Sequence, residues 1–117
     1  MSAAGLYTYH ATVARWVDAD TVDLLVDLGF SMSAKLRFRL ARVNAPERAE
    51  AMHAAALRVA EGVAPVGAAV LVESYKGDRY GRWVGEVRTL SWPGRAGANV
   101  SDAMLAAGVA THYGPKS

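Results

Sequence analysis

Residues 20–47, DTVDLLVDLGFSMSAKLRFRLARVNAPE, decide the fold of this chain. Apolar and polar side chains alternate near both ends of this stretch, which is the pattern of strands with one buried face. In residues 20–28 the apolar face consists of Val22, Leu24, Val26 and Leu28, with Asp23 and Asp27 opposite. In residues 34–43 one face consists of Leu36, Phe38 and Leu40, and the other of Lys35, Arg37 and Arg39. A turn at residues 29–33 is expected to join the two strands.

A corner and a helix follow this pair of strands. Pro46 has no backbone donor and keeps Ala45 extended, so the second strand is expected to end at residues 44–47, Asn-Ala-Pro-Glu. Residues 47–61 predict a helix, because apolar side chains recur at helical spacing at Met52, Ala55, Ala56 and Val59. Gly62 and Pro65 are expected to end this helix.

The rest of the chain adds shorter elements. Strands are expected at residues 6–17, 68–74 and 82–90, and a loop at residues 92–98. Asn99 or Ser101 would cap a short helix that Gly108 closes, and residues 109–113 form a last extended piece. This order predicts a single α+β domain over residues 1–117 that is mainly β, a five-stranded OB-type barrel with two helices.

Composition limits the classes of function. The chain has 117 residues and no cysteine, so it can form one core, but it cannot form a disulfide, a thiolate metal site or a cysteine nucleophile. No apolar run reaches the ~20 residues of a membrane span. The first residues lack the basic and apolar regions of a signal peptide. As written, the chain is expected to be cytoplasmic, although a processed, secreted form would look the same.

Charge is segregated along the chain, although the net charge is only +2. One acidic stretch without a base contains Asp18, Asp20, Asp23 and Asp27. Ten of the 13 lysines and arginines lie in two stretches, which contain Lys35, Arg37, Arg39, Arg42 and Arg48, and Lys76, Arg79, Arg82, Arg88 and Arg95. This pattern suits a site that binds a cation and an anion together, and it equally suits two solvated strand faces.

Three short segments contain residues that can carry chemistry, and each also has a plain structural interpretation. Residues 18–21, Asp-Ala-Asp-Thr, can offer hard oxygens to calcium or form a turn. Residues 39–47 contain an arginine that could bind phosphate and a glutamate that could activate water or merely open the helix. In residues 78–82, Asp-Arg-Tyr-Gly-Arg, Gly81 permits a bend that places Arg82 at a cleft or forms a charged turn.

In order and spacing, these segments together resemble the thermonuclease family, also called staphylococcal nuclease-like domains, from about Tyr7 to Tyr113. The resemblance implies a calcium-dependent nuclease that hydrolyses DNA, RNA or both, with single-stranded or flexible substrates. It implies that Glu47 is the general base and that Arg39 and Arg82 bind the reacting phosphate.

The same resemblance implies a metal site and a nucleotide site. The calcium ligands would be the side chains of Asp20 and Asn44 and the backbone carbonyl of Ala45. Tyr80 and Tyr113 would contact the nucleotide. Asp18 and Asp78 match acidic residues near the site rather than direct ligands.

The chain departs from the best-known members of that family at several points. Asn44 stands where they have aspartate, which removes one negative charge and predicts weaker calcium binding. Ala19 replaces a usual glycine, and the long lysine-bearing loop before the helix is absent. Because the chain stops at Ser117, the third helix is expected to be truncated. A monomer is expected, or a homodimer whose contact covers the surface that this helix would cover.

Other residues have bland explanations, and other functions stay open. His10, His53 and His112 lack metal-ligand spacing and are expected at the surface or rim. Trp16, Trp83 and Trp92 are expected in core or edge packing, although Trp92 could stack a base. The alternatives to a nuclease are a catalytically weak or inactive OB-type nucleic-acid-binding module and a protein-interaction module.

Overall fold

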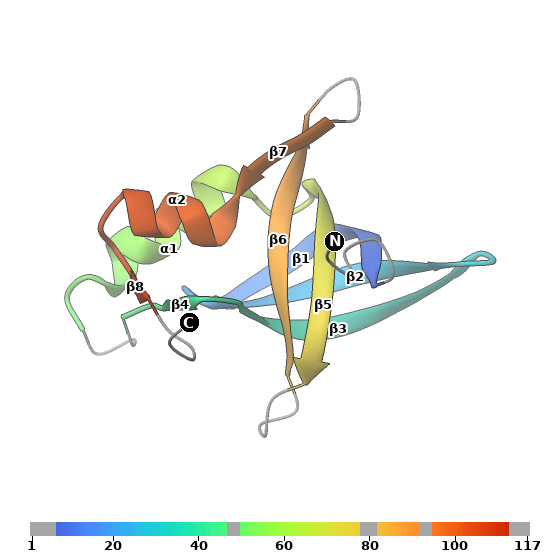
Figure 1. Cartoon of the computed structure of the whole chain (residues 1–117), viewed down its shortest axis with the longest axis horizontal. Coiled ribbons are helices and arrows are strands. Elements are labelled where there is room, and N and C mark those ends of the chain that lie inside the picture. Colours follow the sequence, from blue (N-terminus) through green and yellow to red (C-terminus); the bar gives the residue numbers. More distant parts are fainter. Residues whose placement is uncertain (1–6, 47–49, 78–81, 92–94, 113–117) are drawn as a thin grey trace, which may run out of the picture.

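The computed structural model describes residues 7–46, 50–77, 82–91 and 95–112 (Figure 1). In chain order its elements are β1 (Thr8–Asp18), β2 (Thr21–Gly29), β3 (Met32–Leu40), β4 (Val43–Asn44), α1 (His53–Val63), β5 (Ala69–Gly77), β6 (Trp83–Ser91), β7 (Arg95–Asn99), α2 (Val100–Ala106) and β8 (Thr111–His112). None of the described helices is long and apolar enough to cross a membrane.

Five strands close into a barrel. Their order is β3-β2-β1-β5-β6, and β3 also pairs with β6, so the sheet returns to its first strand. The closing pair is parallel and short, joining residues 38–40 to residues 83–85, whereas the other pairs of the barrel are antiparallel. This arrangement confirms the predicted OB-type, mainly β fold with two helices.

The barrel interior is filled by most of the apolar side chains that the alternation predicted, whereas Leu28, near the hairpin turn, is exposed. Val22, Leu24, Val26, Phe38 and Leu40 are all at most 2% exposed. At the closing seam a glycine is required at position 85, because an added Cβ would lie 2.9 Å from the carbonyl oxygen of Glu73. Trp16 is buried, and its indole N–H donates to the carbonyl of Ala64 at 2.8 Å, which ties the barrel to the end of α1.

The predicted strand over residues 34–43 is two strands in the structure. β3 ends at Leu40, and Arg42 adopts a left-handed conformation with φ 70°, after which β4 begins at Val43. This break explains why Arg42 has the sequence parity of buried Phe38 and Leu40 and still does not enter the core. The backbone turn redirects its side chain, which alternation along a single strand cannot represent.

Two further expectations about elements were wrong. The helix predicted over residues 47–61 begins as α1 at His53, and Met52 is its half-exposed N-cap, with only Ala56 and Ala60 buried within it. The loop predicted over residues 92–98 contains β7, which pairs with β6. Glycine and proline there indicate a turn, but pairing with an existing strand edge overrides local propensity.

The second helix follows the prediction closely. Asn99 is the N-cap of α2, and its side-chain oxygen accepts a hydrogen bond from the backbone N–H of Asp102 at 3.0 Å. Gly108, with φ 72°, follows the helix and allows the chain to turn toward β8. Figure 1 shows both helices at one end of the molecule and the β2–β3 hairpin projecting at the other.

Candidate active site

The turn between β1 and β2 presents Asp20 to the end of β3 and to β4. Its carboxylate accepts a hydrogen bond from the Thr21 hydroxyl at 3.1 Å and from the backbone N–H of Ala45 at 3.4 Å. Its own carbonyl oxygen accepts from the backbone N–H of Leu40 at 2.9 Å. Two segments therefore fix the Asp20 carboxylate, and its side chain remains 18% exposed.

The Arg39 guanidinium lies beside Asp20, at the end of β3. Its Nη1 donates to the carbonyl oxygens of Leu40 and Val43, both at 2.8 Å. Its Nη2 lies 3.4 Å from the side-chain oxygen of Asn44 and 3.7 Å from the carboxylate of Asp20. The turn through Arg42 brings the carbonyls of Leu40 and Val43 to the same nitrogen of Arg39, so the backbone orients the guanidinium.

Arg82 reaches the same place from the start of β6. Its Nη1 donates to the Thr21 hydroxyl at 3.3 Å, and that hydroxyl also donates to Asp20. The parallel β3–β6 pair explains the proximity, because it places the beginning of β6 beside the final third of β3. The structure therefore brings Asp20, Arg39 and Arg82 together around Thr21.

Sequence reasoning assigned no role to Thr21. Its side chain is almost fully buried, at 3% exposure, and its hydroxyl connects the acidic turn to Arg82. The sequence shows a threonine directly after the two aspartates. It does not show that this threonine bridges to Arg82, because Arg82 lies 61 residues away in the chain.

β4 carries the remaining candidates for a metal site. Asn44 is exposed, and its backbone carbonyl accepts a hydrogen bond from the Thr111 hydroxyl at 3.4 Å. Ala45 is buried, with its backbone N–H on the Asp20 carboxylate. Pairing of β4 with β8 holds this segment from its other side.

These groups have the chemistry of a site for a hard cation. A carboxylate from Asp20 and an amide oxygen from Asn44 lie around one nitrogen of Arg39, and the backbone of Ala45 adjoins them. Oxygen ligands of this kind suit calcium. The described residues contain no cluster of three or more histidine, cysteine or acidic side chains, so the donor set carries little negative charge.

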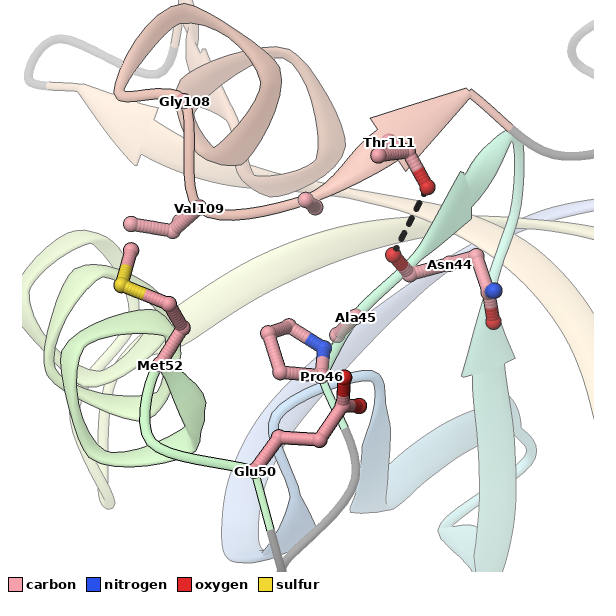
Figure 2. Close-up of a pocket in the computed structure, with 9 residues that line it drawn as sticks. Asn44, Ala45, Pro46, Glu50, Met52, Gly108, Val109 and Thr111 are labelled. Carbon is pink, nitrogen blue, oxygen red and sulfur yellow. Dashed lines mark hydrogen bonds between the residues drawn. The ribbon is translucent and has the colours of Figure 1, made fainter.

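A cavity of about 260 Å³ lies against the same segment (Figure 2). Its lining combines apolar and polar groups from β4, the approach to α1 and the approach to β8, namely Asn44, Ala45, Pro46, Glu50, Met52, Gly108, Val109, Ala110 and Thr111. Figure 2 shows Met52 and Val109 on one side and Asn44 and Thr111 on the other.

Two residues at or near the acidic turn are largely buried. Ala19 is fully buried, and it is not among the described residues with positive φ, so alanine is accommodated there without strain. His53, expected at the surface or rim, is mostly buried with 16% of its side chain exposed. Its Nε2 lies 3.8 Å from the carboxylate of Asp18, which connects the start of α1 to the acidic turn.

A second charged cluster adjoins the candidate site but is bonded differently. Arg42 forms a two-pronged ion pair with the buried Glu86 and a 2.8 Å ion pair with Asp102, and Asn99 also donates to Glu86 at 3.0 Å. The hydrogen bond to Glu86, against the opposing effect of burial, raises the pKa of Arg42 well above its usual range. This cluster joins β6 and α2 to the turn after β3.

The outer surface of β2 and β3 carries a third ion pair. Arg37 Nε donates to the carboxylate of Asp23 at 2.8 Å, and the two residues are register partners. The hydrogen bond from Arg37 lowers the pKa of Asp23. The alternating charges of these two strands are therefore partly paired across the hairpin.

Three residues expected in the site, Glu47, Tyr80 and Tyr113, lie outside the described residues. Trp92 and Asp78 also lie outside them. The described part of the chain brings together the other five, which are Asp20, Arg39, Asn44, Ala45 and Arg82.

Comparison with known proteins identifies a family for this chain. The family model described as staphylococcal nuclease homologue matches residues 37–117, which is more than half of the chain and contains Arg39, the Asn44–Glu47 corner and Arg82. A search of curated proteins gave no match. Members of the matched family are generally nucleases that bind nucleic acids. The extent of the match shows that this chain belongs to the staphylococcal nuclease homologue family.

Proposed function

We propose that this protein is a calcium-dependent endonuclease that hydrolyses phosphodiester bonds in DNA, RNA or both. The observation that supports this most strongly is the meeting of Arg39 and Arg82 beside Asp20, with Thr21 bonded to Arg82 and Asp20. Two cations and one acidic metal ligand from separate segments form the minimum set for binding a phosphodiester and a divalent ion together.

The two arginines bind the phosphate as its charge grows. Hydrolysis puts additional negative charge on the phosphate oxygens in the transition state, where fixed cationic donors are worth most. Carbonyl oxygens hold Arg39 at 2.8 Å, so its position is set before substrate arrives. Guanidinium groups suit this task because they can donate two parallel hydrogen bonds to one phosphate.

The side chains of Asp20 and Asn44, with the backbone carbonyl of Ala45, are proposed to hold calcium. A bound calcium ion would polarise a phosphate oxygen and lower the pKa of water. Asp20 is oriented for this by Thr21 and by the N–H of Ala45. Asn44 contributes an oxygen without charge, so the binding is proposed to be weak.

Glu47 is proposed as the general base that takes a proton from the attacking water. It follows Pro46 in the chain, two residues after Ala45, whose N–H contacts Asp20. Carboxylates in this role typically contribute a factor of ~10²–10⁴ in rate. Tyr80 and Tyr113 are proposed to contact the nucleotide, and the cavity beside Asn44 offers space for part of it. A site that surrounds one phosphate favours single-stranded or flexible substrates.

The test is cleavage of labelled single-stranded DNA and RNA with calcium, with magnesium and with chelator. We expect cleavage with calcium, and we expect Glu47→Gln to lose it by ~10²-fold or more. Glu61→Gln is the matched control, because Glu61 is an exposed glutamate on α1 outside the proposed site. Equal cleavage by both variants, with unchanged circular dichroism, would rule out Glu47 as the base.

The alternative is an OB-type nucleic-acid-binding module with weak or no catalysis. It is favoured by the uncharged Asn44 and by the lack of a three-acid cluster among the described residues. Binding of single-stranded DNA without cleavage in any divalent ion, sensitive to Arg39→Ala, would establish this alternative in place of the nuclease.

A further inference from the structure

One half of β3 is paired on one side only. The strand pairs with β2 along its whole length, but it pairs with β6 only at residues 38–40. Over residues 32–37, β2 is the only pairing partner in the described part of the chain. This half lies in the hairpin that projects away from the helices in Figure 1. Unpaired strand edges readily add another strand.

The hydrogen bonds at the end of β3 show which backbone groups face this edge. The N–H of Leu40 donates to Asp20 on the β2 side, and the N–H of Ala41 donates to Gly85 on the β6 side. Backbone groups alternate sides along a strand, and the β2–β3 register is regular from residue 33 to residue 39. The N–H and C=O groups of Ser33, Lys35 and Arg37 therefore face the open edge.

Exposed apolar side chains lie at both ends of the open edge. At the hairpin turn Phe30 is 95% exposed and Met32 is 60% exposed. At the other end Trp83, the register partner of Phe38, is 43% exposed. An edge that must stay unpaired is usually shortened, bulged, covered or protected by charged side chains. This edge carries Lys35 and Arg37, but it is six residues long and flanked by aromatic rings.

We propose that a second copy of this chain pairs with the open edge, antiparallel and about a twofold axis, with Ala34 opposite the partner's Ala34. Because the edge-facing residues are odd-numbered, each odd residue pairs with an odd residue. Placing Lys35 opposite the partner's Lys35, or opposite the partner's Arg37, sets like charges against each other. Of the registers left, placing Ser33 opposite the partner's Ser33 pairs only residues 32–34, whereas placing Ser33 opposite the partner's Lys35 pairs residues 32–36, because β3 begins at Met32.

This register also supplies an opposite charge. Within one chain Asp27 is the β2 register partner of Ser33. In the dimer Ser33 lies between Asp27 on one side and the partner's Lys35 on the other, on the same face of the sheet. The serine side chain is short, so the lysine can reach across it to the carboxylate, and the twofold axis forms this contact twice.

The same register brings the exposed aromatic residues together. The ladder ends with the partner's Met32 opposite Leu36, because Phe30 and Ser31 have positive φ and form the hairpin turn, and this places the partner's turn beside the start of β6 and Trp83. The partner's hairpin turn thus ends where β6 begins, so the length of the open edge matches the strand that fills it. Burial of Phe30 and Trp83 adds apolar area at both ends of the interface.

A second copy of the chain fits this edge better than a lipid surface does, because only another strand supplies hydrogen-bond partners for Ser33 and Lys35. The inference does not depend on the proposed nuclease activity. Asp20 and Arg39 lie at the opposite end of β2 and β3 from the hairpin turn, so both sites of the dimer stay accessible.

The experiment is sedimentation velocity of the full chain from about 1 µM to about 1 mM, a range that detects weak to moderate dimers. Three substitutions at Ser33 separate pairing from folding. Ser33→Pro removes an N–H that faces the open edge, so the monomer tolerates it. We expect it to raise the dimer Kd at least about tenfold. Ala34→Pro is the matched control, because its N–H faces β2 and its loss lowers the melting temperature.

The charge substitutions must move folding and pairing in opposite directions. In Ser33→Lys the new lysine lies opposite Asp27 of its own chain, and this attraction favours folding. The same lysine lies opposite the partner's Lys35, and this repulsion weakens the dimer. Ser33→Glu reverses both effects. A change of melting temperature and dimer affinity in the same direction would overturn the register.

Two other results would overturn the proposal itself. One is a wild-type chain that stays monomeric over the whole concentration range. The other is a monomer that binds phosphatidylcholine vesicles through Phe30, as shown by loss of binding in Phe30→Ser, which would identify a membrane as the occupant. The proposed nuclease function is tested separately, by measuring nucleic-acid cleavage by Ser33→Pro. Cleavage at the wild-type rate per chain would show that the dimer proposal can fail while the proposed function holds.

Discussion

Arg39 and Arg42 lie three residues apart and are bonded in opposite ways. Arg42 reaches two carboxylates, with Glu86 at 3.0 Å from its Nη2 and Asp102 at 2.8 Å. Arg39 is held at 2.8 Å by two backbone carbonyls, and its Nη2 lies 3.7 Å from the Asp20 carboxylate. The difference follows from the left-handed backbone at Arg42, which turns that side chain toward β6 and α2.

This comparison distinguishes Arg42, which joins parts of the fold, from Arg39, for which we propose phosphate binding. Two carboxylates bind Arg42 at hydrogen-bond distance, whereas two carbonyls orient Arg39 beside the Asp20 carboxylate, which lies 3.7 Å away. Arg42 joins parts of the fold that are far apart in the chain. The backbone holds Arg39 in place, as its proposed role in phosphate binding requires, and Arg82 contacts the same turn through Thr21.

The largest effect is expected at the two arginines proposed to bind phosphate. Arg39→Ala and Arg82→Ala should each slow cleavage by ~10²-fold or more, because each removes a charged donor to the transition state. Arg82→Lys should recover only part of the rate, since an ammonium lacks the two-pronged geometry. The measurement is kcat/KM on labelled single-stranded DNA with calcium. Wild-type rates in Arg82→Lys would show that charge alone matters.

The next largest effect is on stability rather than rate. Arg42→Met should lower the free energy of unfolding by about 2–3 kcal/mol, because it leaves the buried Glu86 carboxylate without its cation, while partial exposure of Arg42 limits the loss. Urea unfolding measures this loss. Arg88→Met, at an exposed position of β6, is the control and should change stability by less than ~0.5 kcal/mol. A similar loss of stability in Arg42→Met and Arg88→Met would show that the contacts of Arg42 with Glu86 and Asp102 have no special structural role.

A moderate effect is expected at Asn44, whose side-chain oxygen lies 3.4 Å from Arg39 Nη2. Asn44→Asp should tighten calcium binding by roughly tenfold, since a second carboxylate beside Asp20 adds charge to the donor set. The rate need not rise, because a more neutralised cation is a weaker Lewis acid. Calorimetric titration of calcium into both forms tests this. Equal or weaker binding in the aspartate form would remove Asn44 from the ligand set.

The smallest effect is expected on the outer face of the hairpin. Arg37 lowers the pKa of Asp23, so their pairing stabilises the fold above about pH 4, near the unfolded pKa of aspartate. That contribution is lost as the pH falls through the lower, folded pKa. Arg37→Gln should therefore be slightly less stable than wild type at pH 7 and equally stable in strong acid, as measured by urea unfolding. Salt should shrink the difference at pH 7, because Arg37 is half-exposed. A difference that persists in strong acid would show that charge is not its origin.

The sequence by itself determined the barrel, the two helices and the resemblance to the family. These depend on local patterns, namely alternation in β2 and β3, the Asn99 cap and the order of three short motifs. Side chains within a few residues of one another establish such patterns, so they can be recognised without knowing the contacts. The start of α1 and the existence of β7 were predicted wrongly, because both depend on what packs or pairs beside them.

Only the tertiary structure decided which partners each arginine meets and, among the described residues, which half of β3 stays open. Arg42 finds Glu86 and Asp102 at separations of 44 and 60 residues, and Thr21 finds Arg82 at 61. The open half of β3 results from the short parallel seam with β6. Both the charge of a site and the exposure of a strand depend on contacts between distant segments. Those contacts form only when the barrel closes, so periodicity within one segment cannot specify them.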